Sequence, residues 1–565
     1  MIRLRSCLLV LSLVVLGGLA AATPADAAGY AVINGSGSSW AGPAIDQWSE
    51  DVHDRGIVVN YSPIGSQQGR SNFAGDLVDF AGSDIAFLNG QDKVAGGVVE
   101  TSQYGYSYLP ITAGGTAFMY HLTVGGRRVT NLRLSGDTIT KIFTGQITTW
   151  SDPRIRADYG ATLPNEPIVP VVRSDGSGAT AQFTAWMNDQ YSSQWSAFCA
   201  QYAHVSARPC GETEFYPSFG RAKAQNGSTA AANYVTSSAG EGSINYDEYA
   251  YAKQSGFPVV KLLNPGGYYV LPTAANDAVA LTKAAIDTNP KSLTYLMQDL
   301  RNVYRNTDPR SYPLSSYSYL IVPRKNRGNR PPQFTDGKGR TLSTWANYFL
   351  CGGQSEADAL GYSPLPINLV RGGLDQVDQI PGAVPTPNRA RLGGCDNPTF
   401  RNGKNTLLAT APMPSACDKH GAPLNCGGGV SQTSTGRTGS GPAAGGGGGG
   451  SSGSSGSTGS STPAGTSGST GSGGGGRPSG TGTTRTTGGT GKVKTQTVDP
   501  NTGQVLTEAS DSGDSQALAA PIQVSAQHDN RTLYAILTAL ELLAVALVPP
   551  FAGSWLRRRR TRSAG

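Results

Sequence analysis

The chain has 565 residues, of which 76 are glycine, and its formal net charge is +7. All of that charge lies at the two ends, because Arg3, Arg5 and the arginines within 557–565 leave residues 6–556 with a balance of zero. A neutral body lacks the basic surface that polyanions require, so nucleic acid is excluded as an expected partner.

Residues 1–27 are predicted to be a signal peptide. Arg3 and Arg5 form a basic start, 8–19 is an apolar run, and Ala25-Asp26-Ala27 provides a cleavage motif of small residues. The segment is therefore left out of the fold, and the chain is expected to be exported.

Six cysteines remain after Cys7, which lies in the signal segment. An even number in an exported chain favours disulfides, and the spacing predicts Cys199–Cys210 and Cys417–Cys426, which leaves Cys351–Cys395. Metal ligation is the alternative, but no C-x-x-C motif and no nearby histidine pair accompany these cysteines.

Residues 29 to about 400 have globular composition, with short strands and helices in alternation. The apolar patterns predict strands at 30–33, 58–64, 80–83 and 169–172, an extended segment at 107–119, and helices at 43–53, 69–77 and 138–143. A further helix after 178 has Phe183, Trp186 and Met187 on one face. Alternation of this kind predicts an α/β fold with a mostly parallel sheet, in which ligands bind at the carboxyl ends of strands.

Four of the predicted strand exits carry small polar loops. They read N-G-S-G-S-S-W at 34–40, I-G-S-Q-Q-G at 64–69, D-F-A-G-S-D at 79–84 and R-S-D-G-S-G-A-T at 173–180. In the fourth loop, free N–H groups at a helix start lie beside the guanidinium of Arg173, which indicates an anion site. An ordinary helix cap with a structural Arg–Asp pair is the alternative for that loop taken alone.

In this order, the motifs G-S-G-S-S-W-A-G-P, Y-S-P-I-G-S-Q-Q-G, V-D-F-A-G-S-D and V-V-R-S-D-G-S-G resemble the extracytoplasmic, PstS-like phosphate-binding proteins of ABC-type phosphate importers. The stretches at 241–254 and 360–366 are similar to the same family, and Ile33-Asn34-Gly35 resembles its DING-type relatives. The resemblance covers roughly 29–372. It implies a two-lobed, type II periplasmic-binding-protein (Venus-flytrap) fold, with lobe one at 28–113 plus 265–400 and lobe two at 114–264.

The resemblance also implies the residues that bind phosphate. They are Ser39, the backbone of Trp40, Ser66, Asp84, Arg173, Asp175 as the partner of Arg173, Ser177, Gly178 and Ala179. The family usually has Thr where Ala179 stands and Phe where Trp40 stands, so one hydroxyl donor is missing unless Thr180 replaces it. No cofactor or metal is implied, and the expected partners are inorganic phosphate and an ABC permease, with the chain as a monomer.

Asp84 is the residue expected to select the ligand. A carboxylate beside an anion is favourable only if it accepts a hydrogen bond from a protonated ligand oxygen, which phosphate has near neutral pH and sulfate lacks. Two other functions stay open: a phosphate sensor or adhesin that kept the fold, and a phosphatase. For the phosphatase, the globular part has no H-E-x-x-H or G-x-S-x-G motif, and His53, His121 and His204 are scattered.

The rest of the chain is expected to attach the globular part to a membrane. A disulfide-closed extension at 401–426 precedes a Gly/Ser/Thr-rich, disordered linker at 427–530. Residues 531–556 are long and apolar enough for one transmembrane helix, although Glu541 is costly there, and an amphipathic surface helix is the alternative. The arginines of the tail at 557–565 predict a cytoplasmic C-terminus and an extracellular globular part.

Overall fold

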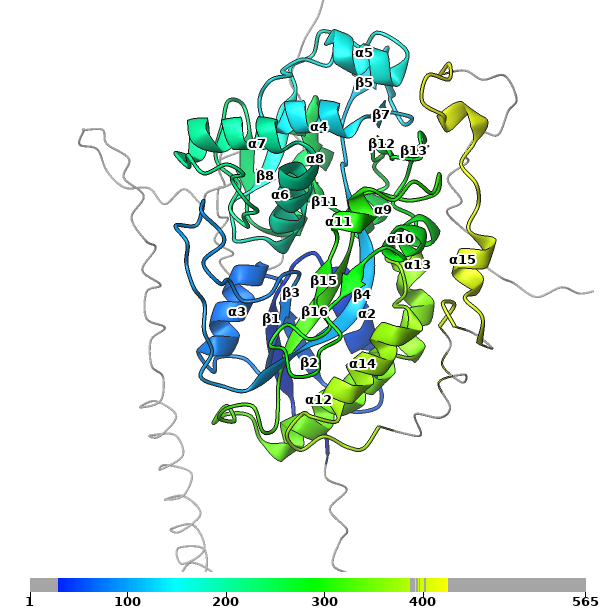
Figure 1. Cartoon of the computed structure of the whole chain (residues 1–565). Helices are drawn as coiled ribbons and strands as arrows, with labels where there is room; N and C mark the ends of the chain where they lie inside the picture. The colour runs from blue at the N-terminus through cyan, green and yellow to red at the C-terminus, as the bar shows by residue number, and fades with distance from the viewer. Residues whose placement is uncertain (1–28, 387–391, 393–394, 396, 401–402, 425–565) are drawn as a thin grey trace, which may run out of the picture. The chain divides into compact units, whose positions relative to one another are not determined.

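The computed structural model describes residues 29–386, 392, 395, 397–400 and 403–424 (Figure 1). The predicted signal peptide, linker, transmembrane helix and basic tail lie outside these residues. Within the described ranges, no helix is both long and apolar enough to cross a membrane.

A six-stranded sheet carries the first lobe. Its strands are β1 (Ile33–Gly37), β2 (Val59–Ser62), β3 (Phe80–Ser83), β4 (Tyr106–Ala117), β11 (Asp247–Glu248) and β16 (Ser315–Pro323), in the order β11-β4-β16-β3-β1-β2. The helices α2 (Gly42–His53), α3 (Ser66–Ala74), α12 (Asp336–Phe349) and α14 (Ile367–Val377) pack around it (Figure 1).

The expectation of a mostly parallel sheet is wrong for these six strands. β1 pairs parallel with β2 and β3, but β16 pairs antiparallel with β3 and β4, and β11 antiparallel with β4. Parallel pairs come from strand–helix–strand units, whereas β16 enters the sheet late in the chain and is free to run the other way.

A smaller, fully parallel sheet carries the second lobe. It has the order β10-β8-β9, with β8 (Val169–Arg173) between β9 (Lys223–Gln225) and β10 (Ser243–Asn245). The helices α4 (Gly136–Phe143), α6 (Gly178–Gln190) and α8 (Gly227–Thr236) belong to this lobe. β4 runs past the predicted lobe boundary at 113/114, where Ala117 pairs with Asp247 of β11. The exact lobe limits stay a prediction.

Two element boundaries differ from the expected ones in a way that affects the site. The first strand covers 33–37 and not 30–33, because Tyr30 and Val32 are exposed. The helix expected from Gly69 begins at Ser66, directly after Gly65, whose φ of +100° turns the chain into the helix. Sequence periodicity missed this first turn because Ser66 and its neighbours are polar. The N–H groups at 66 and 67 therefore belong to the start of a helix.

Two of the three predicted disulfides are present, Cys199–Cys210 and Cys351–Cys395. The third cannot be placed in the described structure, because Cys426 lies outside it.

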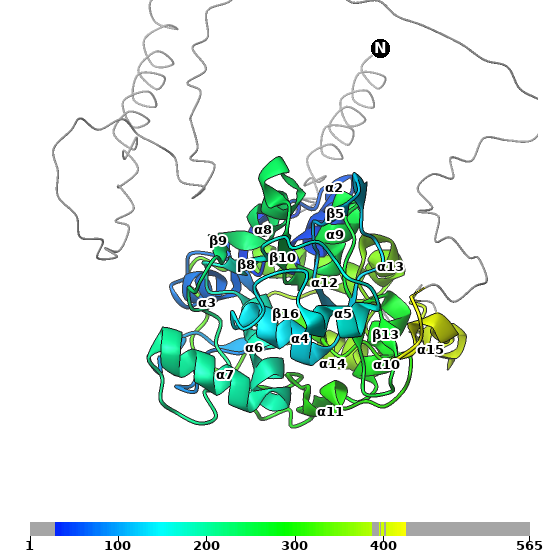
Figure 2. The same cartoon turned by 90° about the horizontal axis from the view of Figure 1, so that it is seen from above.

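The segment 403–424 runs along both lobes, drawn in yellow in Figure 1. Its helix α15 (Thr406–Thr410) packs beside α10 (Ala274–Leu281), as the view from above also shows (Figure 2). Farther on, Asp418 forms an ion pair with Lys261 at 2.7 Å, and the buried Arg133 donates to the carbonyls of Cys417 and Ala422.

Candidate anion-binding site

The four polar loops meet where the two lobes touch. Asp84 follows β3 of the first lobe, and Arg173 ends β8 of the second. The contact is tight, since a Cβ added to Gly178 would lie 2.1 Å from Asp84 Oδ2. A Cβ added to Gly65 would likewise lie 2.6 Å from Asp175 Oδ2. Glycine is required at both positions for the lobes to approach this closely.

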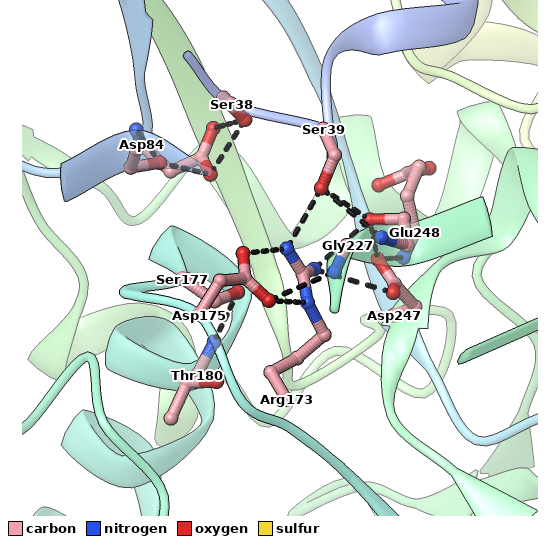
Figure 3. A network of polar contacts seen from close by, with 12 residues as sticks. Ser38, Ser39, Asp84, Arg173, Asp175, Ser177, Thr180, Gly227, Asp247 and Glu248 are labelled. Carbon is pink, nitrogen blue, oxygen red and sulfur yellow. Dashed lines mark hydrogen bonds and ion pairs between the residues drawn. The ribbon is translucent and has the colours of Figure 1, made fainter. Parts of the chain in front are cut away.

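Arg173 is the centre of the cluster (Figure 3). Its side chain is buried, and Nε and Nη2 donate to the two oxygens of Asp175 at 2.8 and 2.5 Å. Nη1 donates to Ser228 Oγ at 3.0 Å and lies 3.4 Å from Asp247 Oδ2. Burial opposes the charge, but Asp247 and Asp175 outweigh it and raise the pKa of Arg173, so the guanidinium stays charged.

Ser39 connects this arginine to the first lobe. Its Oγ accepts from Arg173 Nη2 at 2.8 Å and from the Ser228 N–H at 3.2 Å, and it lies 2.8 Å from Ser228 Oγ. Ser228 is at the start of α8, where the preceding N–H, that of Gly227, donates to Asp175 Oδ1 at 2.9 Å. We call Arg173, Asp175, Asp247, Ser39 and Ser228 the Arg173 cluster.

Asp84 is surrounded by hydroxyl groups. Its carboxylate accepts from Ser38 at 2.8 and 2.9 Å, from Ser66 at 3.2 Å and from Ser318 at 2.6 Å. Burial raises the pKa of Asp84, while these three hydroxyls and the more distant Arg173 oppose the rise. Asp84 is therefore a buried acceptor whose neighbours are neutral donors, which suits contact with a protonated oxygen.

The start of α6 supplies the remaining predicted residues. Ser177 caps the helix, with its Oγ accepting from the Thr180 N–H at 3.3 Å, and Gly178 and Ala179 form the first turn. Thr180 does not replace the missing hydroxyl at Ala179, because its Oγ1 bonds to Tyr246 OH at 2.8 Å. Trp40 is buried, and its carbonyl accepts from Tyr362 OH at 2.5 Å.

Several residues that contact the site were not predicted from the sequence. Ser318 lies in the middle of β16, 234 residues from its partner Asp84, and carries no local signal. Asp247 is in the stretch 241–254, which was noted for its resemblance but not for its charge. Ser228 follows Asn226-Gly227 at a helix start, and this small polar loop after β9 could have been counted as a fifth.

A second buried arginine lies close to the site and was also missed. Arg70 of α3 forms ion pairs with Glu100 and Glu214, both at 2.7 Å, and donates to Ser83 Oγ at 3.1 Å. Glu214 belongs to the second lobe, and its carbonyl accepts from the Ser177 N–H at 2.9 Å. We call Arg70, Glu100, Glu214 and Ser83 the Arg70 cluster.

A cavity of about 670 Å³ borders Asp84 on one side. It is strongly acidic, since Asp189, Glu212, Asp287 and Asp299 line it together with Arg301. Among the described residues, no group of three or more His, Cys, Asp or Glu side chains is arranged to hold a metal ion. His121 contacts the carbonyl of Val235 and the carboxylate of Glu241, away from the Arg173 cluster.

Comparison with known proteins places these features in a family. A family model described as a PBP superfamily domain matches residues 22–352. The phosphate-binding protein PstS of Xylella fastidiosa (strain Temecula1) is 29% identical over 60% of this chain and 83% of its own length. The phosphate-binding protein PstS3 of Mycobacterium bovis (strain BCG) is 28% identical over 61% and 86%. A solved DING protein shares 17% identity over 60% of this chain and 93% of its own, with a TM-score of 0.40. Because the family model covers more than half of its length, the chain belongs to the PBP superfamily.

Proposed function

We propose that this protein binds inorganic phosphate between its two lobes and delivers it to an ABC permease. The proposal rests on one observation. A buried cation, Arg173, and a buried carboxylate, Asp84, lie on opposite lobes at the same contact, and serine hydroxyls surround both. The relatives named above as phosphate-binding proteins support the same ligand.

The chemistry of the site fits a partly protonated oxyanion. A buried anion needs a donor for each of its oxygens. The hydroxyls of Ser39 and Ser66 would become neutral donors to it by exchanging their contacts with Ser228 and Asp84, and the N–H groups of Gly178 and Ala179 lie at the start of α6. Arg173 would add one charged contact. Asp84 would accept the proton that phosphate carries and sulfate does not, so a dianion without a proton would be rejected by charge repulsion.

Transport requires recognition by a membrane permease as well as a binding site. We propose that lobe closure around phosphate is the signal that a membrane permease recognises. The apolar segment 531–556, which lies outside the described residues, would hold the protein near that permease, with the globular part outside the cell.

The test is calorimetry of the purified full-length chain with phosphate, arsenate and sulfate. We expect phosphate and arsenate to bind with one ion per chain and sulfate to bind at least 100-fold more weakly, which corresponds to about 2.7 kcal/mol. In Asp84→Asn, whose amide can donate to a sulfate oxygen, the two affinities should approach each other. Unchanged selectivity in this variant would contradict the role of Asp84, and turnover of a phosphate ester would indicate a phosphatase instead.

A further inference from the structure

The guanidinium of Arg173 is held by two carboxylates, of which only Asp175 was expected. Asp247 lies on the other side of the guanidinium from Asp175 (Figure 3), and its side chain is buried. Its Oδ2 is 3.4 Å from Arg173 Nη1, and its Oδ1 accepts from Ser228 Oγ at 2.8 Å and from the Glu248 N–H at 2.9 Å.

These contacts place Asp247 behind the residues expected to bind the anion, with Arg173 or Ser228 in between. Ser228 connects Asp247 to Ser39, since the hydroxyls of the two serines are 2.8 Å apart. Asp247 thus acts on the donors that would bind an anion, Arg173 Nη1 directly and Ser39 through Ser228. We therefore treat it as a residue that acts through its neighbours and not as one that touches the anion.

The second carboxylate changes the charge of the site. Arg173 brings one positive charge, while Asp84, Asp175 and Asp247 each bring a negative charge when ionised. The net charge of these four side chains before a ligand binds is therefore −2, and without Asp247 it would be −1. Because the site is buried, water screens its charges only weakly, so a ligand with two negative charges is repelled more strongly than a ligand with one.

Phosphate exists near neutral pH in two forms, one with two protons and one negative charge, the other with one proton and two charges. Asp84 can accept a hydrogen bond from either form, so it does not distinguish them. We propose that Asp247 is a specificity-determining residue that directs the site toward the singly charged dihydrogen form. This inference rests on the proposed function.

Other titratable groups surround Asp247, and Asp277, which acts on its neighbour Glu248, has a pKa that burial raises to about 8, within the range of the test, in the wild type and in Asp247 variants alike. Arg173 stays charged, and burial raises the pKa values of Tyr251 of α9 (Tyr249–Ser255) and of Tyr362. Burial, Asp277 of α10 and Asp247 itself raise the pKa of Glu248, the neighbour on its own strand. Burial also raises the pKa of Asp247, and Arg173 and Ser228 oppose that rise. Asp175 faces it across the guanidinium.

The test is the pH dependence of phosphate affinity, measured by calorimetry on the full-length chain between about pH 6 and about pH 8.5, where the ligand changes form. We expect the wild-type affinity to fall by about tenfold across this range, as the singly charged form disappears. In Asp247→Asn the fall should shrink to about twofold, with the largest gain in affinity at the alkaline end. Asp336→Asn, at an exposed acid in the first turn of α12, is the control and should keep the wild-type profile.

The possible outcomes separate the two proposals. An Asp247→Asn profile parallel to that of the wild type, whether weaker or not, would overturn the role of Asp247 and leave phosphate binding in place. If Asp247→Asn does not fold, as judged by its melting curve, Asp247→Ser keeps a hydroxyl for Ser228 and is measured in its place. Absence of phosphate binding by the wild type at every pH would overturn the proposed function itself.

Discussion

Two buried arginines lie at the contact between the lobes, and each is held by two carboxylates and at least one serine. They differ in where the carboxylates come from. Both acids of the Arg173 cluster, Asp175 and Asp247, lie within 114–264, the range predicted for the second lobe. In the Arg70 cluster, Glu100 lies on the first lobe and Glu214 on the second.

This difference indicates two separate tasks. The ion pair of Arg173 with Asp175 joins two residues of one loop and needs no contact between lobes, so we expect it to orient the guanidinium before the lobes close. The longer contact with Asp247 is different, because Asp247 lies on β11 of the six-stranded sheet. The pair between Arg70 and Glu214 crosses from one lobe to the other and is complete only when they meet. Arg173 would therefore determine what binds, and Arg70 how firmly the lobes stay closed around it.

The largest effect is expected for Arg173→Gln. Removing this cation takes away the only positive charge of its cluster and leaves Asp175 and Asp247 buried without a charged partner. Phosphate affinity should fall by more than about 100-fold, and the free energy of unfolding should drop by about 3–5 kcal/mol. Calorimetry and urea unfolding measure the two effects.

The double variant Arg173→Gln/Asp175→Asn should recover part of the stability and none of the binding. If Arg173→Gln alone kept its affinity within tenfold, the guanidinium would not be the anion-binding group.

A buried carboxyl with no arginine beside it extends the comparison. Asp277 of α10 accepts from Ser315 Oγ at 2.7 Å, and its other oxygen has no hydrogen-bond partner among the described residues. Burial raises the pKa of Asp277 to about 8, with Ser315 opposing the rise. The folded chain thus keeps a proton that the unfolded chain loses near its ordinary pKa of about 4.

The contribution of Asp277 to the free energy of unfolding is therefore fully present below about pH 4. It is lost as the pH rises toward 8, at up to about 1.4 kcal/mol per pH unit. Asp277→Asn should remove this slope, so its melting temperature should rise relative to that of the wild type as the pH is raised from 5 to 8. Melting curves at several pH values measure this. Parallel curves for the two proteins would show that Asp277 is ionised in the folded state.

The third effect, on lobe closure, is tested by Glu214→Gln. Arg70 keeps Glu100 and Ser83 in this variant, so the first lobe should remain folded while the charged contact across the lobes is lost. We expect phosphate affinity to fall by about tenfold, or about 1.4 kcal/mol, mainly through faster release. Stopped-flow release of phosphate measures the rate.

Arg330→Gln breaks an ion pair with Asp336 whose side chains are well exposed, and it serves as the matched control with no expected change. A slower association with unchanged release in Glu214→Gln would contradict a role in holding the lobes closed.

The two clusters also show how far the sequence could lead. The loops that hold Ser39, Asp84 and Arg173 were recognisable as small polar segments at strand ends, which is a local signal, and the family resemblance then implied these residues within them. The ion pair of Arg70 with Glu214 joins positions 144 residues apart, and the sequence near either residue does not predict this contact. In the fold, helices and strands followed from apolar periodicity, but the antiparallel insertion of β16 depends on how distant segments meet. Local patterns therefore predicted the four polar loops that the structure brings together, whereas the residues behind these loops depend on tertiary packing.

The smallest effect is expected for an ion pair outside both clusters. Asp418 and Lys261 join the C-terminal segment to β12 (Lys261–Leu263) at 2.7 Å, and about a fifth of each side chain is exposed, so water weakens the attraction. Asp418→Asn should lower the free energy of unfolding by less than about 1 kcal/mol and leave phosphate affinity unchanged within twofold. Thermal unfolding and calorimetry of this variant, beside Glu214→Gln, compare a partly exposed pair with a buried one. An affinity loss as large as that of Glu214→Gln would mean that the segment 403–424, and not only the Arg70 cluster, controls closure of the lobes.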